Sequence, residues 1–113
     1  MKPIQSLFQA ILFFLIVNTS LKAQELQRDD ILGNWLVQSE DAVVNIYRDG
    51  DRFKGKIVWL KTPLNKRGEP MKDTNNVDRE LRKKPAMGLV ILKGFIFKAN
   101  GTWEDGTVYD PKN

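Results

Sequence analysis

The amino-acid sequence predicts an all-β domain built as an antiparallel meander of hairpins. Apolar and polar residues alternate from Ala42 to Arg48 and again from Arg52 to Leu60, which is the period of half-buried strands. Asp49-Gly50 separates these two runs, and Asn100-Gly101 separates two later ones. Both dipeptides are strong signals for a tight hairpin turn. At 113 residues the chain has room for one small domain.

The first 23 residues have the three parts of a secretory signal peptide. A basic start at Lys2 precedes an apolar run from Leu7 to Val17, and small or polar residues lead to Ala23, where cleavage is expected. The run is shorter than the ~20 residues that a membrane span needs. A signal peptide is therefore favoured over an N-terminal anchor, with no transmembrane span left after cleavage. Residues 1–23 predict export, to the periplasm or out of the cell, of a domain covering 24–113.

Composition excludes several kinds of chemistry. The chain contains no Cys and no His, so disulfides, thiolate nucleophiles, Ser-His pairs and Cys- or His-ligated metal sites are excluded. Loss of Lys2 and Lys22 with the signal peptide would lower the net charge from +4 to +2. So small an excess is not the footprint of a nucleic-acid-binding protein. We expect no cofactor, no metal and no nucleic-acid partner.

The first strand is expected over residues 31–37, before the hairpin at Asp49-Gly50. With these two residues as the turn, Ile46 would face Phe53. This register gathers the apolar side chains of both strands on one face: Ala42, Val44, Ile46, Phe53, Ile57 and Trp59. A slip of one residue would mix lysines into that face, which is why this register is favoured.

A second hairpin is expected to run over residues 89–98 and to return over residues 102–109. A two-residue turn at Asn100-Gly101 would set Phe97 against an acidic residue. A three-residue turn, with its glycine in the left-handed conformation, sets Phe97 against Trp103 instead. We expect the three-residue turn.

Between the hairpins lies a charged loop, residues 61–84, in which eight Lys and Arg face four Asp and Glu. So long a loop in a small domain is either functional or mobile. Two interpretations stay open: a flap that attracts phosphate or lipid headgroups, or a solvated connection. Asp78 is expected to cap one helical turn that ends before Pro85. Four residues are expected to hold the loop through hydrogen bonds from side chain to backbone: Asp73, Asn75, Asn76 and Asp78.

No catalytic constellation assembles from these residues. Ser39 is the one serine after residue 23, and it has no His to activate it. Glycosidase chemistry needs two carboxylates on opposite sides of the scissile bond. The carboxylates close in sequence are Glu104 with Asp105, Asp105 with Asp110, and Asp73 with Asp78. Turn formation explains most of them, and residues 73–84 lack the ligands of a calcium loop. We therefore predict neither catalytic residues nor a metal site.

The three tryptophans of the chain lie on different expected strands, which suits either a packed core or an aromatic-lined cavity. We expect the interior of the meander to present five side chains to a ligand: Trp35, Val44, Ile46, Ile57 and Trp59.

Several short motifs occur in an order that resembles one bacterial family. Gly33-Asn34-Trp35 comes first, Gly55 to Leu60 follows, and residues 103–111 close the series. Together they resemble domain of unknown function 2147, a family of small exported bacterial proteins. The following positions belong to these family motifs, and no role is known for them: Gly33, Asp73, Asn76, Asp78, Gly88, Trp103, Gly106, Tyr109, Asp110 and Pro111.

The resemblance implies a lipocalin-like antiparallel β-barrel, with Trp35 of the Gly-x-Trp motif at the barrel floor. The family pattern continues past Pro111 with further strands, whereas this sequence stops at Asn113. We therefore expect an incomplete barrel, truncated at its C-terminal end, with exposed edge strands. The resemblance implies no established activity.

Three functions are compatible with these features. The leading hypothesis is an exported binding module, rather than an enzyme, whose interior holds a small apolar ligand, because barrels of about eight strands have room for one. The alternative is an envelope-associated structural or interaction protein that uses residues 61–84 on anionic surfaces. A hydrolase that relies on carboxylates alone is the third.

Overall fold

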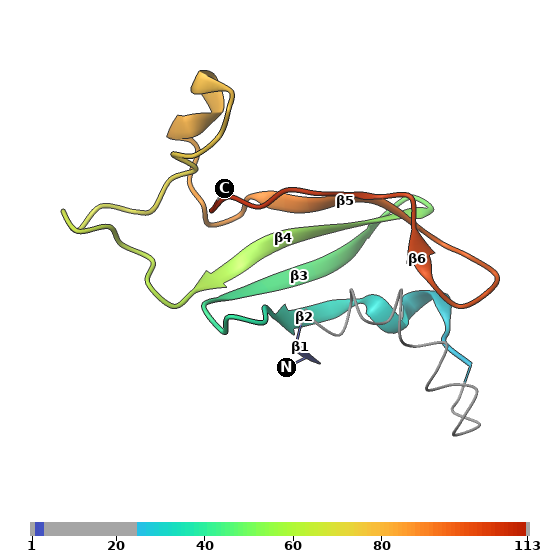
Figure 1. Ribbon diagram of the computed structural model, residues 1–113. Helices are drawn as coiled ribbons and strands as arrows, with labels where there is room; N and C mark the ends of the chain where they lie inside the picture. Colours follow the sequence, from blue (N-terminus) through green and yellow to red (C-terminus); the bar gives the residue numbers. More distant parts are fainter. Residues whose placement is uncertain (1, 4–24, 113) are drawn as a thin grey trace.

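The computed structural model describes residues 2–3 and 25–112. Within them the chain is all-β, an antiparallel meander that forms an open half-barrel (Figure 1). The strands are β1 (Lys2–Pro3), β2 (Gly33–Leu36), β3 (Ala42–Asp49), β4 (Arg52–Leu60), β5 (Val90–Phe97), β6 (Trp103–Glu104) and β7 (Thr107–Val108). Two 3₁₀ helices accompany them, η1 (Arg28–Ile31) and η2 (Arg79–Lys83). The predicted fold class is confirmed.

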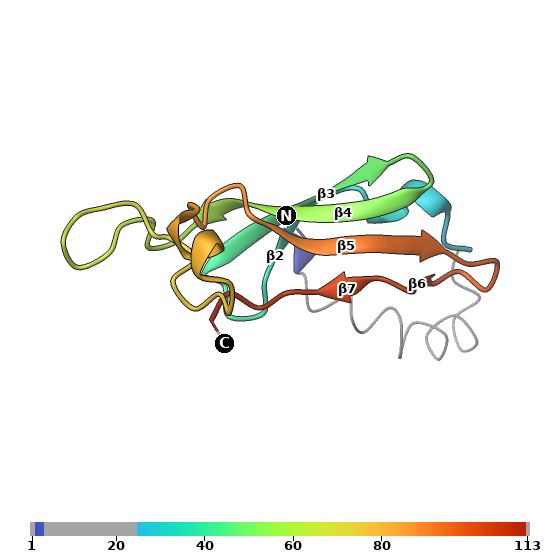
Figure 2. The ribbon, with the colours of Figure 1, turned by 90° about the horizontal axis from the view of Figure 1, so that it is seen from above.

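The strands follow one another across the sheet in sequence order from β1 to β6, and β7 continues β6 along β5. The loop between β4 and β5 extends beyond one end of the sheet, and the C-terminal tail ends beside its base (Figures 1 and 2). The predicted signal peptide, residues 1–23, lies outside the described residues except for β1, which pairs in parallel with β2. In the part of the chain that is described, no helix has the length and apolar character to cross a membrane.

The first hairpin forms where predicted, but the predicted register differs from the observed one by two residues. Asp49 pairs with Arg52, so Gly50 and Asp51 form the turn, and Ile46 faces Gly55. Gly50 has a φ of +67°, as the first central residue of a type II′ turn requires, whereas the predicted turn would need positive φ at two positions. Because the shift is an even number of residues, the side chains up to Val44 and Ile57 keep their predicted faces.

A β-bulge changes the end of this hairpin. Val44 faces Ile57 and Val43 faces Trp59, so Val58 is the extra residue of β4. The inserted residue reverses the alternation beyond it, which moves Trp59 to the face of the sheet opposite to Val44 and Ile57. Trp59 is 44% exposed. The prediction that Trp59 lies on the apolar interior face is therefore wrong.

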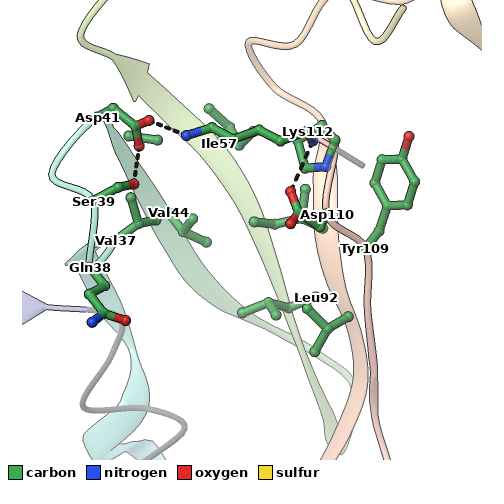
Figure 3. A pocket seen from close by; sticks show the side chains of 14 residues that line it. Val37, Gln38, Ser39, Asp41, Val44, Ile57, Leu92, Tyr109, Asp110 and Lys112 are labelled. Carbon is green, nitrogen blue, oxygen red and sulfur yellow. Dashed lines mark hydrogen bonds and ion pairs between the residues drawn. The ribbon is translucent and has the colours of Figure 1, made fainter. Parts of the chain in front are cut away.

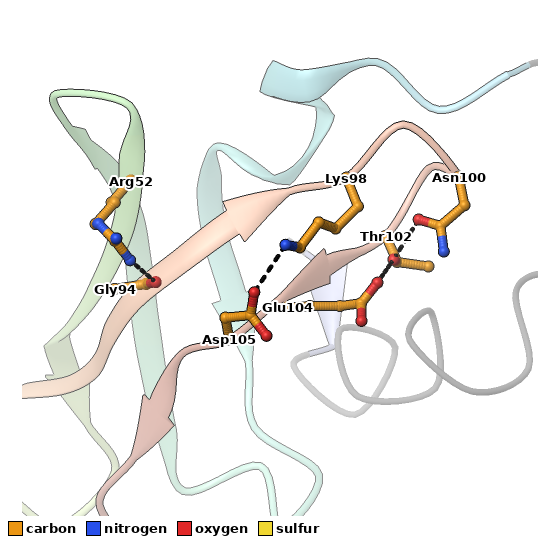
Figure 4. Close-up of polar contacts among 7 residues, drawn as sticks. All are labelled: Arg52, Gly94, Lys98, Asn100, Thr102, Glu104 and Asp105. Atoms are coloured by element: carbon orange, nitrogen blue, oxygen red, sulfur yellow. Dashed lines mark hydrogen bonds and ion pairs between the residues drawn. The ribbon is translucent and has the colours of Figure 1, made fainter.

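The second hairpin has the predicted register. Phe97 faces Trp103, their ring centroids lie 5.1 Å apart, and Gly101 has a φ of +87°. Figure 4 shows how polar contacts hold this hairpin, including Lys98 with Asp105. The strand that returns is broken at Gly106 into β6 and β7. A Cβ atom at Gly106 would lie 2.3 Å from the ring of Phe95, so this position admits no side chain without a shift of the ring.

The core closes one end of the half-barrel. It consists of Ile31, Trp35, Val44, Ile46, Phe53, Leu92 and Trp103. Ile31 belongs to η1 rather than to the first strand, which is shorter than predicted. The indole N–H of Trp35 donates to the carbonyl of Ile31 at 2.7 Å, and that of Trp103 donates to the carbonyl of Arg28 at 3.1 Å. Trp35 on β2 and Trp103 on β6 therefore both hold η1 over the closed end of the half-barrel.

Candidate functional site

The other end of the concave side is open and forms a groove of about 730 Å³, which we call the concave groove (Figure 3). Its apolar lining consists of Val37, Ala42, Val44, Ile57, Ile91, Leu92, Val108 and Pro111. The polar residues along it are Gln38, Ser39, Asp41, Tyr109, Asp110 and Lys112. Val44 and Leu92 also belong to the core, so the groove continues the barrel interior outward. A volume within about 300–1,000 Å³ and a mainly apolar lining are typical of small-molecule sites.

An ion pair joins the two walls of the concave groove. Lys112 in the C-terminal tail contacts Asp41 in the turn between β2 and β3, and Ser39 Oγ donates to the same carboxylate at 2.6 Å. The hydrogen bond from Lys112, followed by that from Ser39, lowers the pKa of Asp41. Asp41 is therefore ionised at neutral pH, and its charge is matched by Lys112.

The five residues predicted to face a ligand divide into three groups. Val44 and Ile57 line the concave groove. Trp35 and Ile46 lie in the core at the closed end and do not line the groove. Trp59 lies on the outer face because of the β-bulge and does not line the groove. The groove is thus displaced from the expected position toward the turn after β2.

A buried carboxylate ties the β4–β5 loop to the C-terminal tail. Asp73 is 1% exposed, and it accepts hydrogen bonds from Asn76 Nδ2 at 2.9 Å and from the Tyr109 hydroxyl at 2.8 and 3.0 Å. We call Asp73, Asn76 and Tyr109 the Asp73 cluster. Desolvation, followed by the hydrogen bond to Asp73, raises the pKa of Tyr109. The phenol is therefore a neutral donor at neutral pH.

Further hydrogen bonds support the same junction. Asn75 Nδ2 donates to the carbonyl of Pro111 at 3.1 Å, and Arg82 Nε donates to the carbonyl of Asn76 at 2.6 Å. Asp78 caps η2, as predicted, by accepting from the N–H of Glu80 at 3.0 Å. The Asn76 side chain accepts from the N–H of Asp78 at 2.8 Å. The loop is therefore held by side-chain-to-backbone bonds, as expected for Asn75, Asn76 and Asp78, whereas the Asp73 carboxylate accepts from side chains.

The family-motif positions gather mostly around this junction and along the groove. Asp73, Asn76 and Tyr109 form the cluster, Asp78 stands next to it, and Asp110 and Pro111 line the concave groove. Trp103 lies in the core and Gly106 lies against Phe95. Gly33 and Gly88 have positive φ, +120° and +87°. Most of these residues therefore determine how the loop and tail are placed, and hence the shape of the groove.

Glu104 and Asp105, one of the carboxylate pairs considered for hydrolysis, are held by neighbouring residues. Lys98 Nζ lies 2.8 Å from Asp105, and the hydrogen bond to that carboxylate raises the pKa of Lys98. Glu104 accepts from the hydroxyl of Thr102. In Figure 4 the Glu104 and Asp105 side chains point toward these different partners rather than toward one shared space. Their geometry fits the hairpin better than a catalytic pair.

Of the residues that line the concave groove, only Val44 and Ile57 were predicted as ligand contacts. Most of the others lie in the turn between β2 and β3, residues 37–41, and in the C-terminal tail, residues 109–112, which carry no pattern that places them together. Ala42 was expected on the apolar face with Val44, and Leu92 lies in an apolar run of the second hairpin. Which face it would take depends on the bulges between β4 and β5.

Comparison with known families agrees with the motifs. The family model described as "Uncharacterized protein conserved in bacteria (DUF2147)" matches residues 33–113, well over half of the chain. The chain belongs to the DUF2147 family. Neither the curated proteins nor the solved structures contain a significant match. The DUF2147 match begins at the first glycine of β2 and includes every strand from β2 to β7, so the groove and the Asp73 cluster both lie within the family domain.

Proposed function

We propose that this DUF2147 domain is a binding module that holds a small apolar ligand in the concave groove. The observation that carries the proposal is the groove itself: eight apolar side chains line an open space that continues the core. Apolar surface exposed to water in a cleft favours association with an apolar molecule. At the mouth, Lys112 is already paired with Asp41, and Asp110 adds a second carboxylate to the lining, so the groove does not favour an anionic ligand.

A neutral fluorescent probe, N-phenyl-1-naphthylamine, tests this proposal. We expect saturable binding, with a rise in probe fluorescence, and an affinity at least tenfold lower in Ala42→Phe, because the added ring would occupy the groove. Ala99→Phe is the matched control, since Ala99 is exposed in the turn between β5 and β6. Its affinity should stay within twofold of the wild type. Absence of binding, or equal losses in both variants, would exclude the concave groove as the site.

We also propose that the protein is exported, to the periplasm or out of the cell, with residues 1–23 removed. The basic start, the apolar run and Ala23 support this. Mass spectrometry of the protein recovered from the periplasm or medium of an expressing bacterium should give a chain that begins at Gln24. Recovery of the uncleaved chain from the cytoplasm alone would contradict the proposal. Ala23→Arg should block cleavage, whereas Ala99→Arg should not.

A further inference from the structure

A second hollow, of about 770 Å³, lies where the β4–β5 loop folds back over the sheet. Lys54 and Lys93 belong to its lining, and their neighbours Phe53 and Leu92 are buried in the core. Because successive residues of a strand point to opposite faces, the two lysines stand on the outer face. This lysine hollow is therefore a different site from the concave groove, although the two share the edge formed by β5 and β7.

The lysine hollow combines positive charge with exposed apolar surface. Lys54, Lys84 and Lys93 line it, and none of its lining residues is Asp or Glu. Lys54 pairs with Asp49 at 2.9 Å. Among the described residues, Lys84 and Lys93 make no salt bridge. Two lysines without a salt bridge therefore line the same space.

The Asp73 carboxylate, which accepts hydrogen bonds from two residues of the lining, is buried. It lies behind Asn76 and Tyr109, which both line the hollow and both donate to it. At 1% exposure it is not accessible to a molecule in the hollow. An anion at the rim would therefore meet Lys84 and Lys93 without contacting a carboxylate of the lining.

Three of the most exposed apolar side chains of the described chain also belong to the lining. Val77 is 92% exposed, Val108 is 52% exposed and Met87 is 43% exposed. Apolar groups gathered in one hollow favour an apolar occupant. Charge and apolar surface together indicate an amphipathic anion, and the concave shape suits a single chain better than the plane of a bilayer.

We propose that the lysine hollow binds one alkyl or acyl chain that carries a carboxylate or phosphate headgroup. Lys84 and Lys93 contact the headgroup through charge-assisted hydrogen bonds, and Val77, Met87 and Val108 contact the chain. The proposal does not depend on the concave groove, since the two sites take ligands of different charge and differ in most of their lining.

The test is calorimetric titration of the protein with decyl phosphate below its micelle concentration. Decanol supplies the same chain without charge, and inorganic phosphate supplies the charge without the chain. We expect decyl phosphate to bind at least tenfold more tightly than either. Lys84→Glu with Lys93→Glu should lower its affinity at least tenfold. The control pair Lys61→Glu with Lys66→Glu makes the same change of net charge outside the hollow and should stay within twofold.

Other outcomes would overturn the proposal. Equal losses in the two lysine pairs would mean that only the net charge matters. A loss of decyl phosphate binding in Ala42→Phe would place this ligand in the concave groove instead. Binding to anionic phosphatidylglycerol vesicles without any binding of monomeric decyl phosphate would identify a membrane surface as the partner. Binding of N-phenyl-1-naphthylamine should be the same in the variant with Lys84→Glu and Lys93→Glu as in the wild type. Each of the two proposed binding sites can therefore be excluded without excluding the other.

Discussion

Trp103→Ala is expected to lower the free energy of unfolding by about 3–5 kcal/mol, the cost of deleting a fully buried aromatic side chain. Trp103 is 3% exposed, lies against Phe97 and donates its indole N–H to the carbonyl of Arg28. Its loss would open a cavity in the core and release η1 from the returning strand. Urea denaturation followed by far-ultraviolet circular dichroism measures the change. Because a domain this small has little stability to spare, the variant is expected to be largely unfolded at 37 °C.

Trp59→Ala is the matched control, since it removes the same side chain from the outer face. Trp59 is 44% exposed and lies outside the core, so we expect a loss of about 1 kcal/mol or less. Trp103→Phe keeps an aromatic ring but loses the indole donor, and its loss of stability should lie between the two. Equal losses of stability for Trp59→Ala and Trp103→Ala would contradict the β-bulge that places Trp59 on the outer face.

The contrast between the two tryptophans shows what the sequence could predict. The pairing of Trp103 with Phe97 follows from short-range information, because a three-residue turn with a left-handed glycine sets both strands. The position of Trp59 depends on one inserted residue, Val58, and alternating apolar residues do not reveal where a bulge occurs. The register of the first hairpin was missed for a similar reason, since Asp49 and Gly50 fit more than one turn.

The candidate site was predictable only in part. Val44 and Ile57 face the groove because strand alternation places them there. The rest of the groove depends on contacts between residues far apart in the chain, such as Lys112 with Asp41 and Tyr109 with Asp73. Turn and loop residues have no period from which such contacts can be inferred. The capping of η2 by Asp78, in contrast, was predictable because a cap involves residues only a few positions apart.

Loss of the Asp73 carboxylate is the second change with a large expected effect. Asp73→Ala should lower the free energy of unfolding by about 3 kcal/mol, because two donors lose a charged acceptor and hydrogen bonds to charged groups contribute more than neutral ones. The tail would then be free to leave the loop, so affinity for N-phenyl-1-naphthylamine should fall as well. Asp51→Ala is the control, since Asp51 is exposed in the turn of the first hairpin, and it should change stability by less than about 0.5 kcal/mol.

Tyr109→Phe separates the hydrogen bond from the ring that carries it. The variant should be less stable than the wild type, whereas Tyr47→Phe, which keeps the ring that Lys56 contacts, should have unchanged stability.

The Tyr109 pKa is raised in the folded state by desolvation and by Asp73. Above the ordinary tyrosine pKa of about 10 the unfolded chain therefore loses this proton first, and the stability contributed by Tyr109 declines as the pH rises further. The difference in stability between wild type and Tyr109→Phe should be constant from pH 7 to 9 and shrink above pH ~10. If the difference in stability grew above pH ~10 instead, the result would contradict the hydrogen bond between Tyr109 and Asp73.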